Sequence, residues 1–137
     1  HFRYVNNADP MKSKQLYKGL DQLMDEGVAQ LFTLDMNGRR VIGTVGALQY
    51  EVIQYRLEHE YGAKCTYENL QVHKACWVEP ENPKNDEFKE FKRVKQRYLA
   101  KDKQGQLVFL ADSEFTIQMT QSKYPTVKLH FTSEFKN

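Results

Sequence analysis

Residues 28–46 read VAQLFTLDMNGRRVIGTVG, and this stretch holds two runs of strand-forming side chains on either side of a turn. Val28 to Asp35 and Arg40 to Val45 each fit a β-strand by composition. Asn37-Gly38 lies between them and is a strong signal for a two-residue hairpin loop. The stretch therefore predicts a β-hairpin, followed by a helix that Gly46 opens.

A helix is also expected on the N-terminal side of the hairpin. Asp9 followed by Pro10 is typical of a helix start, because the Asp side chain can cap the first turn and proline suits the first helical position. Gly27 fits the residue that follows a helix C-terminus. Apolar residues between these ends recur at helical spacing, which predicts one buried stripe of Leu16, Leu20, Leu23 and Met24.

The helix after the hairpin is expected to stop at Gly62. Its apolar residues are Leu48, Val52, Ile53 and Leu57. Alternating residues at 2–6 and 64–69 add one strand before the first helix and one after the second. The order is then strand, helix, strand, strand, helix, strand, the split βαβ (βαββαβ) arrangement of ferredoxin-like folds. We expect an α/β fold of the α+β kind, an antiparallel sheet with flanking helices.

The second half of the chain repeats this order of elements. The expected strands are 71–79, 97–101, 107–111 and 126–131, and the expected helices are 86–95 and 113–121. The side chains expected to point inward are Phe88, Phe91, Val94, Val127, Leu129 and Phe131. Residues 107–111 are apolar on both faces, which predicts a central strand. A second βαββαβ unit is therefore expected, while the low similarity between the halves leaves a true sequence repeat open.

The composition fits one globular domain. A chain of 137 residues can bury one core, so we predict a single domain over 1–137, with two packed lobes at 1–69 and 70–137 as the alternative. The net charge is only +2, so nucleic-acid binding would need a local basic patch. No apolar run approaches the length of a membrane span, and we expect no membrane partner.

The two cysteines, Cys65 and Cys76, lie in strand-like runs and lack the spacing of a CxxC pair. We expect buried free thiols, because a free cysteine behaves as a small hydrophobic residue. A chain without a disulfide framework indicates a reducing compartment, so we expect a cytoplasmic protein. The sequence opens at His1 without an initiator Met and enters a strand at once, which indicates a piece of a longer protein.

No catalytic motif is complete. Gly38 and Gly43 have the spacing of a phosphate loop, but Thr44 stands next where that motif needs Lys. Residues 43–46 have the GxxG form of some RNA-contacting loops, but a turn between strand and helix is favoured. The histidines lack metal-ligand spacing, and they are His1, His59, His73 and His130. We expect no catalytic, cofactor-binding or metal-binding residue here, and so a non-catalytic chain.

Basic residues gather between Lys84 and Lys103, where eight Lys or Arg stand against four Asp or Glu. In a helix over 86–97 they would form one face opposite the inward phenylalanines. That face consists of Lys89, Lys92, Arg93 and Arg97. It fits either a phosphate-contacting surface or an ordinary solvated one.

Two further basic sets are candidate contacts. The first helix has lysines in its N-terminal half and acids at its C-terminal end, an order that opposes the helix dipole. Local rules are broken more often at functional sites, although these lysines can instead pair with acids on a neighbouring element. The hairpin tip adds two arginines that can reach a phosphate, although polar tips are common. The residues concerned are Lys12, Lys14, Lys18, Arg39 and Arg40.

Three segments of the first half match the motifs of one known family. Residues 9–23 are similar to the start of the signature DPxKxKQLxKGLxQLxEEG, and 25–27 fit its end with shifted acidic positions. Residues 41–52 look like the GxVGxLQFxV segment, with Tyr50 in place of Phe. Arg56-Leu57 and Glu60-Tyr61 fit the RLxxEY that follows. The first half therefore resembles class II peptide chain release factors, which are translational GTPases.

The second half carries shorter matches. Residues 75–78 resemble the family's ARWV strand, with Cys76 in place of Arg, which puts any role of that Arg in doubt here. Residues 123–127 are similar to ERxPDVxF, with Thr126 in place of Asp. The resemblance spans nearly the whole chain. It implies the C-terminal domain that follows a GTP-binding domain and a β-barrel domain.

The resemblance also implies a function. The full protein would bind the ribosome after peptide release, displace the class I release factor and hydrolyse GTP to leave. The expected partners are ribosomal RNA and protein, the protein's own GTPase and β-barrel domains, and class I release factors indirectly. GTP and Mg²⁺ are expected in the GTPase domain, outside these residues. The alternatives are a stand-alone RNA-binding or protein-binding module, and an enzyme with an unfamiliar site.

Overall fold

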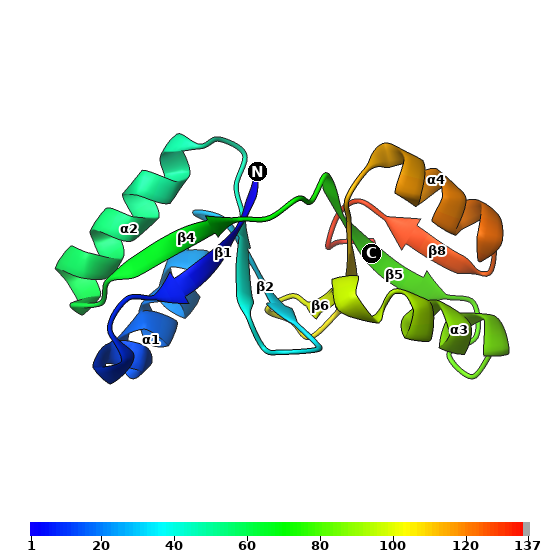
Figure 1. The fold of residues 1–137 in the computed structure, drawn as a ribbon, viewed down its shortest axis with the longest axis horizontal. Coiled ribbons are helices and arrows are strands. Elements are labelled where there is room, and N and C mark those ends of the chain that lie inside the picture. The colour runs from blue at the N-terminus through cyan, green and yellow to red at the C-terminus, as the bar shows by residue number, and fades with distance from the viewer. Residues whose placement is uncertain (136–137) are drawn as a thin grey trace. The chain divides into compact units, whose positions relative to one another are not determined.

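The structure is a computed structural model that describes residues 1–135. Within these residues, strands pair antiparallel in the order β4-β1-β3-β2-β6-β7-β5-β8, and four α-helices accompany them (Figure 1). The expected α/β class with an antiparallel sheet is confirmed. The chain divides into two compact units, one of His1–Phe32 and Arg39–Leu70, the other of Thr33–Gly38 and the chain from Gln71 on. The last two residues of the predicted domain 1–137 lie outside the described residues.

The first unit follows the expected order of elements. They are β1 (Phe2–Asn7), the 3-10 turn η1 (Pro10–Lys12), α1 (Ser13–Asp25), β2 (Gln30–Leu34), β3 (Arg40–Gly43), α2 (Leu48–Tyr61) and β4 (Cys65–Asn69). Its strands stand in the order β4-β1-β3-β2, with β2 ending in the second unit. The ferredoxin-like assignment of this unit stays a prediction.

The start and end of the first helical segment are as expected. The Asp9 carboxylate accepts a hydrogen bond from the Met11 N–H at 3.0 Å, which caps η1 ahead of α1. Gly27 has a φ of 78°, and its N–H donates to the Met24 carbonyl at 2.9 Å. A positive φ suits glycine, so Gly27 ends the helix at low cost. The predicted stripe is buried, with Leu16, Leu20, Leu23 and Met24 at most 7% exposed.

The prediction of a two-residue hairpin loop is wrong. Residues 35–39 form the loop, because β2 ends at Leu34 and β3 begins at Arg40. Gly38, with a φ of 71°, donates its N–H to the Leu34 carbonyl at 2.9 Å. The Asp35 N–H donates to the carbonyl of Leu99 instead of pairing across the hairpin. These two bonds satisfy the N–H groups of Asp35 and Gly38 and hold the loop in a wider turn.

The helix after the hairpin begins at Leu48, two residues later than predicted, and it buries only part of its apolar residues. Tyr50, Ile53 and Leu57 are at most 1% exposed, whereas Leu48 is 70% and Val52 43% exposed. The Tyr50 hydroxyl donates to the Ile42 carbonyl at 2.7 Å, which turns the aromatic ring inward. Positions 50, 53 and 57 also fit helical spacing, so the apolar pattern alone allowed either face.

One apolar core holds the first unit together. α1 and α2 both pack on the strands through a shared cluster of buried side chains. Gly19 allows the two helices to approach closely, because a Cβ there would lie 2.8 Å from a Leu57 methyl carbon and 2.9 Å from the Tyr61 ring. The helices therefore depend on a residue without a side chain at this crossing.

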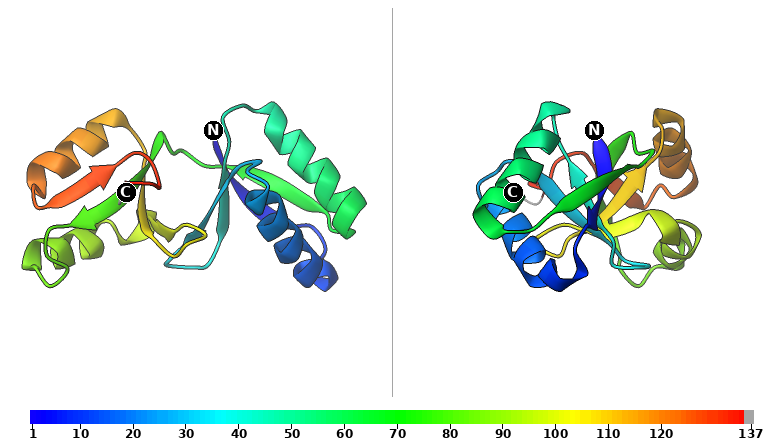
Figure 2. Two further views of the ribbon diagram at one scale, coloured as in Figure 1. Left: turned by 180° about the vertical axis from the view of Figure 1, so that it is seen from behind. Right: turned by 60° about the vertical axis from the view of Figure 1, so that its left-hand side comes forward.

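The second unit contains β5 (Lys74–Pro80), α3 (Asp86–Val94), the 3-10 turn η2 (Gln96–Tyr98), β6 (Leu99–Lys101), β7 (Leu107–Ala111), α4 (Glu114–Lys123) and β8 (Val127–His130) (Figure 2). Its strands stand in the order β6-β7-β5-β8, so β7 lies between two neighbours, as its two-sided apolar pattern predicts. A second ferredoxin-like unit also stays a prediction.

The core of the second unit is mostly as expected. Phe88, Phe91, Val127 and Leu129 belong to one buried cluster with residues of α4 and the central strands. The prediction that Val94 and Phe131 point inward is wrong, since they are 43% and 46% exposed. Val94 is the last residue of α3, and the last buried residue of that helix is Phe91. Phe131 lies one residue beyond the end of β8 at His130.

Candidate nucleic-acid interface

Three of the predicted basic residues lie on the exposed side of α3. Asn85 caps this helix by accepting a 2.7 Å hydrogen bond from the Glu87 N–H. Acids occupy the first turn, and Lys92 and Arg93 occupy the last, an order that the helix dipole favours. Because Phe88 and Phe91 fix the buried face, the cations are held toward solvent.

The surroundings of these cations differ. The Lys89 ammonium lies 4.0 Å from the Asp86 carboxylate, and the Lys92 ammonium lies 4.6 Å from the centroid of the Phe88 ring. Arg93 is exposed and has no ion pair with any residue of the described chain. The predicted face therefore contains at least one cation free to meet an external anion.

A single helix through residue 97 is not present. α3 ends at Val94, and Lys95 caps it with its N–H donating to the Phe91 carbonyl at 2.9 Å. Arg97 lies on η2 instead, exposed and without an acidic partner in residues 1–135. The predicted spacing of four residues between Arg93 and Arg97 is thus not a helical repeat. We call Lys89, Lys92, Arg93 and Arg97 together the α3–η2 basic face.

The lysines of the first helical segment form a second exposed set. Lys12 lies on η1, and Lys14 and Lys18 lie on α1. None of the three makes an ion pair with another described residue, although pairing with a neighbouring element was one expectation. The three lysines therefore keep their unfavourable order relative to the helix dipole, whereas Glu26 at the other end of the helix pairs with Arg56 at 2.9 Å.

The two arginines expected at the hairpin tip do not project from it. Arg40 begins β3, and its guanidinium lies 4.5 Å from the centroid of the Tyr17 ring. The Arg39 guanidinium lies 3.6 Å from the centroid of the Tyr4 ring and 3.3 Å from Glu68. The wider loop turns both side chains back onto their own unit, so each already has partners.

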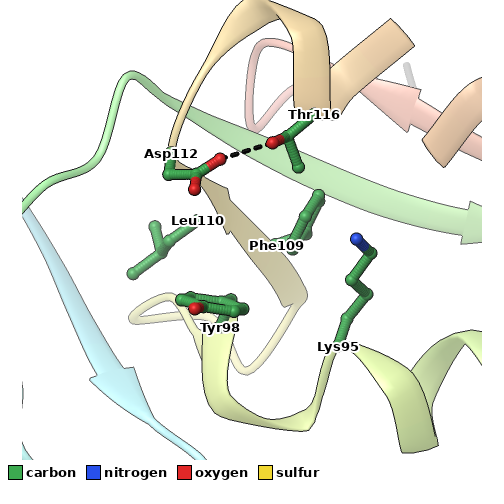
Figure 3. A pocket seen from close by; sticks show the side chains of 6 residues that line it. All are labelled: Lys95, Tyr98, Phe109, Leu110, Asp112 and Thr116. Atoms are coloured by element: carbon green, nitrogen blue, oxygen red, sulfur yellow. Dashed lines mark hydrogen bonds between the residues drawn. The ribbon is translucent and has the colours of Figure 1, made fainter. Parts of the chain in front are cut away.

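A small pocket opens beside the α3–η2 basic face. It has a volume of about 120 Å³ and is lined by Lys95, Tyr98, Phe109, Leu110, Asp112 and Thr116 (Figure 3). Lys95 and Tyr98 come from the segment that ends α3 and forms η2. Asp112 and Thr116 come from the start of α4, and the apolar residues Phe109 and Leu110 come from β7. All of these residues lie in the second unit.

The glycine loop before α2 does not fit a phosphate group. The side-chain oxygen of Gln49 accepts hydrogen bonds from the N–H groups of Val45 and Gly46, at 3.0 and 3.1 Å. The Thr44 N–H donates to the His1 carbonyl at 2.9 Å. A phosphate loop needs such N–H groups free, whereas here they already have partners, so this loop is a closed turn.

The buried titratable groups are packing residues. Cys65 and Cys76 are buried free thiols, as expected. Burial raises the pKa of Cys76 to about 12, and it also raises the pKa of Cys65. Burial likewise raises the pKa of Tyr67, whose hydroxyl donates to the Tyr50 carbonyl at 2.8 Å. A thiol whose pKa is raised by burial is a poor nucleophile at neutral pH.

Histidine and acidic side chains do not converge on one point. His59 stacks on Tyr55 with ring centroids 4.1 Å apart. His73 lies 3.4 Å from Glu114, and His130 lies 3.0 Å from a carboxylate oxygen on β5. Within residues 1–135, no three His, Cys, Asp or Glu side chains are placed to hold a metal ion. Every helix in that range is also too short or too polar to cross a membrane.

The fold and the charged surfaces define an antiparallel α/β domain that presents basic side chains to solvent from α1, α3 and η2. The family model for the class II release factor RF3, C-terminal domain, matches residues 1–121. The chain therefore belongs to this family, and the resemblance seen in the sequence is confirmed. It is a domain of a translation-termination factor.

Some residues of the candidate interface were not predicted from the sequence. Lys95, Tyr98 and Asp112 share one pocket only because η2 and the start of α4 lie on either side of β7. The available signal was the cluster of an aromatic residue with cations at 95–98. Nothing in the sequence placed Asp112 opposite this cluster.

Proposed function

We propose that this domain contacts the ribosome and that the α3–η2 basic face meets ribosomal RNA. The observation that carries the proposal is the exposure of Arg93 and Arg97 without an acidic partner in residues 1–135. Guanidinium groups bind phosphate strongly because they present several donors in a fixed plane. Membership of a release-factor family makes ribosomal RNA the natural source of such phosphates.

In the full protein, this contact helps the GTP-dependent dissociation of class I release factors after translation termination. GTP and Mg²⁺ are bound by a GTPase domain outside this chain, and the domain itself is non-catalytic. The closed turn at residues 43–46 supports this division, because its N–H groups are already satisfied. The domain also packs against its own GTPase and β-barrel domains, and the protein acts in the cytoplasm.

A protein-binding role is the second candidate, favoured by an apolar surface on the first unit. Val45, Leu48 and Tyr55 are 95%, 70% and 63% exposed, and Val52 follows the same side of α2. Large exposed apolar side chains that share a helix face are typical of protein contacts. A Leu48→Glu, Tyr55→Glu double variant would weaken ribosome association without changing its salt dependence if this surface carries the contact.

The test is the release reaction itself. In the full-length factor, Lys89, Lys92, Arg93 and Arg97 are changed together to Gln, and class I factor dissociation from post-termination ribosomes is followed with GTP present. We expect dissociation to slow at least about tenfold at sub-saturating factor, because charge-assisted contacts contribute most of such binding. GTP binding by the factor alone should not change.

A matched variant controls for net charge. It carries Gln at four other exposed lysines, Lys64, Lys103, Lys123 and Lys128, and so removes the same formal charge. The proposal predicts near-normal dissociation for this control. Equal slowing in both variants would indicate a general charge effect, and no slowing in the α3–η2 variant would contradict the proposal.

A further inference from the structure

The pocket beside the α3–η2 basic face contains one cation and one carboxylate that do not pair with each other. Lys95 and Asp112 both line it, yet they form no ion pair. The Lys95 ammonium lies instead 5.5 Å from the centroid of the Phe109 ring. The pocket therefore offers donor groups on the η2 side and acceptor groups on the α4 side (Figure 3).

The carboxylate of Asp112 is held in place by α4. Its Oδ1 accepts a hydrogen bond from the Thr116 hydroxyl and a longer one, 3.4 Å, from the Ser113 hydroxyl. The Ser113 oxygen in turn accepts from the Thr116 N–H at 3.1 Å as the helix cap. Oδ2 has no hydrogen-bond partner among residues 1–135. One oxygen thus orients the group, and the other remains free to accept.

Tyr98 supplies an aromatic surface at the same opening. It is 46% exposed, while Phe109 and Leu110, which also line the pocket, are at most 2% exposed. An exposed ring next to apolar lining residues suits a flat ligand, because stacking tolerates any planar π-system. The volume of about 120 Å³ is well below the roughly 300 Å³ at which pockets for whole small molecules begin. It admits one ring system, with the remainder of the ligand outside.

We propose that this pocket binds a single unpaired RNA base that carries an exocyclic amino group. The base stacks on Tyr98, its amino group donates to Asp112 Oδ2, and Lys95 lies near the attached phosphate. This inference rests on the proposed function, since it names the part of the RNA that the second unit recognises. Unpaired bases are recognised in this manner, by aromatic stacking and hydrogen bonds to the base edge.

A cationic protein side chain is the rival occupant. Asp112 and Tyr98 could also hold an arginine, through an ion pair and a cation–π contact. Two cations stand near this opening: Lys95 lines the pocket, and the exposed Arg97 precedes Tyr98 in the sequence. They repel a further cation and attract a phosphate. The charges therefore favour a base joined to a phosphate.

The test uses the 137-residue chain and fluorescein-labelled hexanucleotide RNAs made of uridine with one variable base. The variable base is uracil, cytosine, adenine or guanine, and dissociation constants are measured by fluorescence anisotropy. We expect the best amino-bearing base to bind at least about fivefold more tightly than uracil, the lower end of what one stacked and paired base contributes. Asp112→Asn should reduce this preference to less than about twofold.

Tyr98→Leu provides a second variant, at an exposed position where folding is tolerant. This variant should lower the affinity for the preferred oligonucleotide by about fivefold or more. Gln118→Ala, at another exposed position of α4, is the control and should leave every affinity unchanged. Circular dichroism checks that all three variants fold.

Several outcomes would overturn the inference. These are equal affinity for all four RNAs, no saturable binding at millimolar RNA, or a base preference that survives both pocket variants. The pocket would be a protein-binding site if it bound an arginine-containing hexapeptide in place of RNA and if both pocket variants weakened that binding. If removing charges from the α3–η2 basic face lowers RNA affinity but no base is preferred, the proposed function stands and this inference alone fails.

Discussion

The indole Nε1–H of Trp77 donates a 3.0 Å hydrogen bond to Oδ2 of Asp102, which ties β5 to the turn between β6 and β7. The same carboxylate accepts the N–H groups of Gln104 and Gln106 at 3.0 and 2.9 Å, and the Gln106 side-chain amide at 2.9 Å. Gly105, with a φ of 81°, completes the turn. One acidic side chain therefore sets the turn and satisfies the buried end of the only tryptophan.

Replacing Asp102 with Ala should destabilise the protein by about 1–3 kcal/mol, because Trp77 is only 2% exposed and its N–H would lose its partner. Urea unfolding followed by Trp77 fluorescence measures the change. Gln104→Ala, in the same turn, is the control and should shift the free energy of unfolding by no more than about 0.5 kcal/mol. Equal stability of Asp102→Ala and the wild type would show that this bond adds nothing.

Gly19→Ala should also destabilise, although alanine is the better helix former by about 1 kcal/mol. The new Cβ would lie 2.8 Å from a Leu57 methyl carbon and 2.9 Å from the Tyr61 ring, so these side chains or the helices that carry them must shift. We expect a net loss of about 1–3 kcal/mol. A Cβ at Gly46 meets nothing within 4 Å, and Gly46→Ala should be nearly neutral in the same denaturation assay.

The two faces of α2 can be separated by truncation. Ile53→Ala should cost about 2–5 kcal/mol, because its side chain is fully buried. Leu48→Ala should change the free energy of unfolding by no more than about 0.5 kcal/mol, since Leu48 is 70% exposed. Thermal unfolding by circular dichroism would compare them. A larger loss at Leu48 than at Ile53 would mean that the helix is rotated from the described position.

The Arg56 cluster predicts a pH dependence of stability. The Arg56 guanidinium donates to Glu60 and, at 2.9 and 3.1 Å, to Glu26. Its hydrogen bond to Glu60 lowers the pKa of that carboxyl in the folded state. A lowered folded-state pKa stabilises the protein above the unfolded value of about 4.3, and this contribution is lost as the pH falls through the folded-state pKa.

Glu60→Gln should therefore flatten the fall in stability between about pH 5 and pH 3. Urea unfolding midpoints at pH 7 and pH 3.5 measure this fall. The midpoint of the wild type should drop further than that of the variant. Glu51→Gln, at an exposed position on the same helix, is the control. Its urea midpoint should drop as far as that of the wild type. If the urea midpoints of the wild type and of Glu60→Gln drop by the same amount, the Arg56–Glu60 pair does not contribute to the stability of the fold.

The elements of this fold were predictable where local chemistry is strong. The first helical segment shows this. Asp9 with Pro10 marks its start, Gly27 marks its end, and the leucines of α1 mark its buried face, all as the structure confirms. The family resemblance could also be read directly, because long runs of α1 and α2 match its motifs, and the match to residues 1–121 confirms it.

The failures arise where tertiary contacts choose between local alternatives. α2 has apolar residues on two faces, and the buried face is the one that packs into the core of the first unit, where the Tyr50 hydroxyl also donates to the Ile42 carbonyl. The hairpin loop widened because the Asp35 N–H found a partner in Leu99, far away in sequence. The pocket at Asp112 depends on the crossing of η2, β7 and α4, which no local pattern encodes. The roles of the basic residues stay predictions.

Ribosome binding as a function of salt shows whether the α3–η2 basic face contacts phosphate groups of ribosomal RNA. The association constant of the wild type is measured at several salt concentrations, beside the variant with Gln at Lys89, Lys92, Arg93 and Arg97. Each lost phosphate contact should lower the slope of log K against log salt by about 0.9 in magnitude, by analogy with duplex DNA. We expect weaker binding and a shallower slope for the variant, with an unchanged free energy of unfolding. Wild-type affinity and slope in the variant would contradict this expectation.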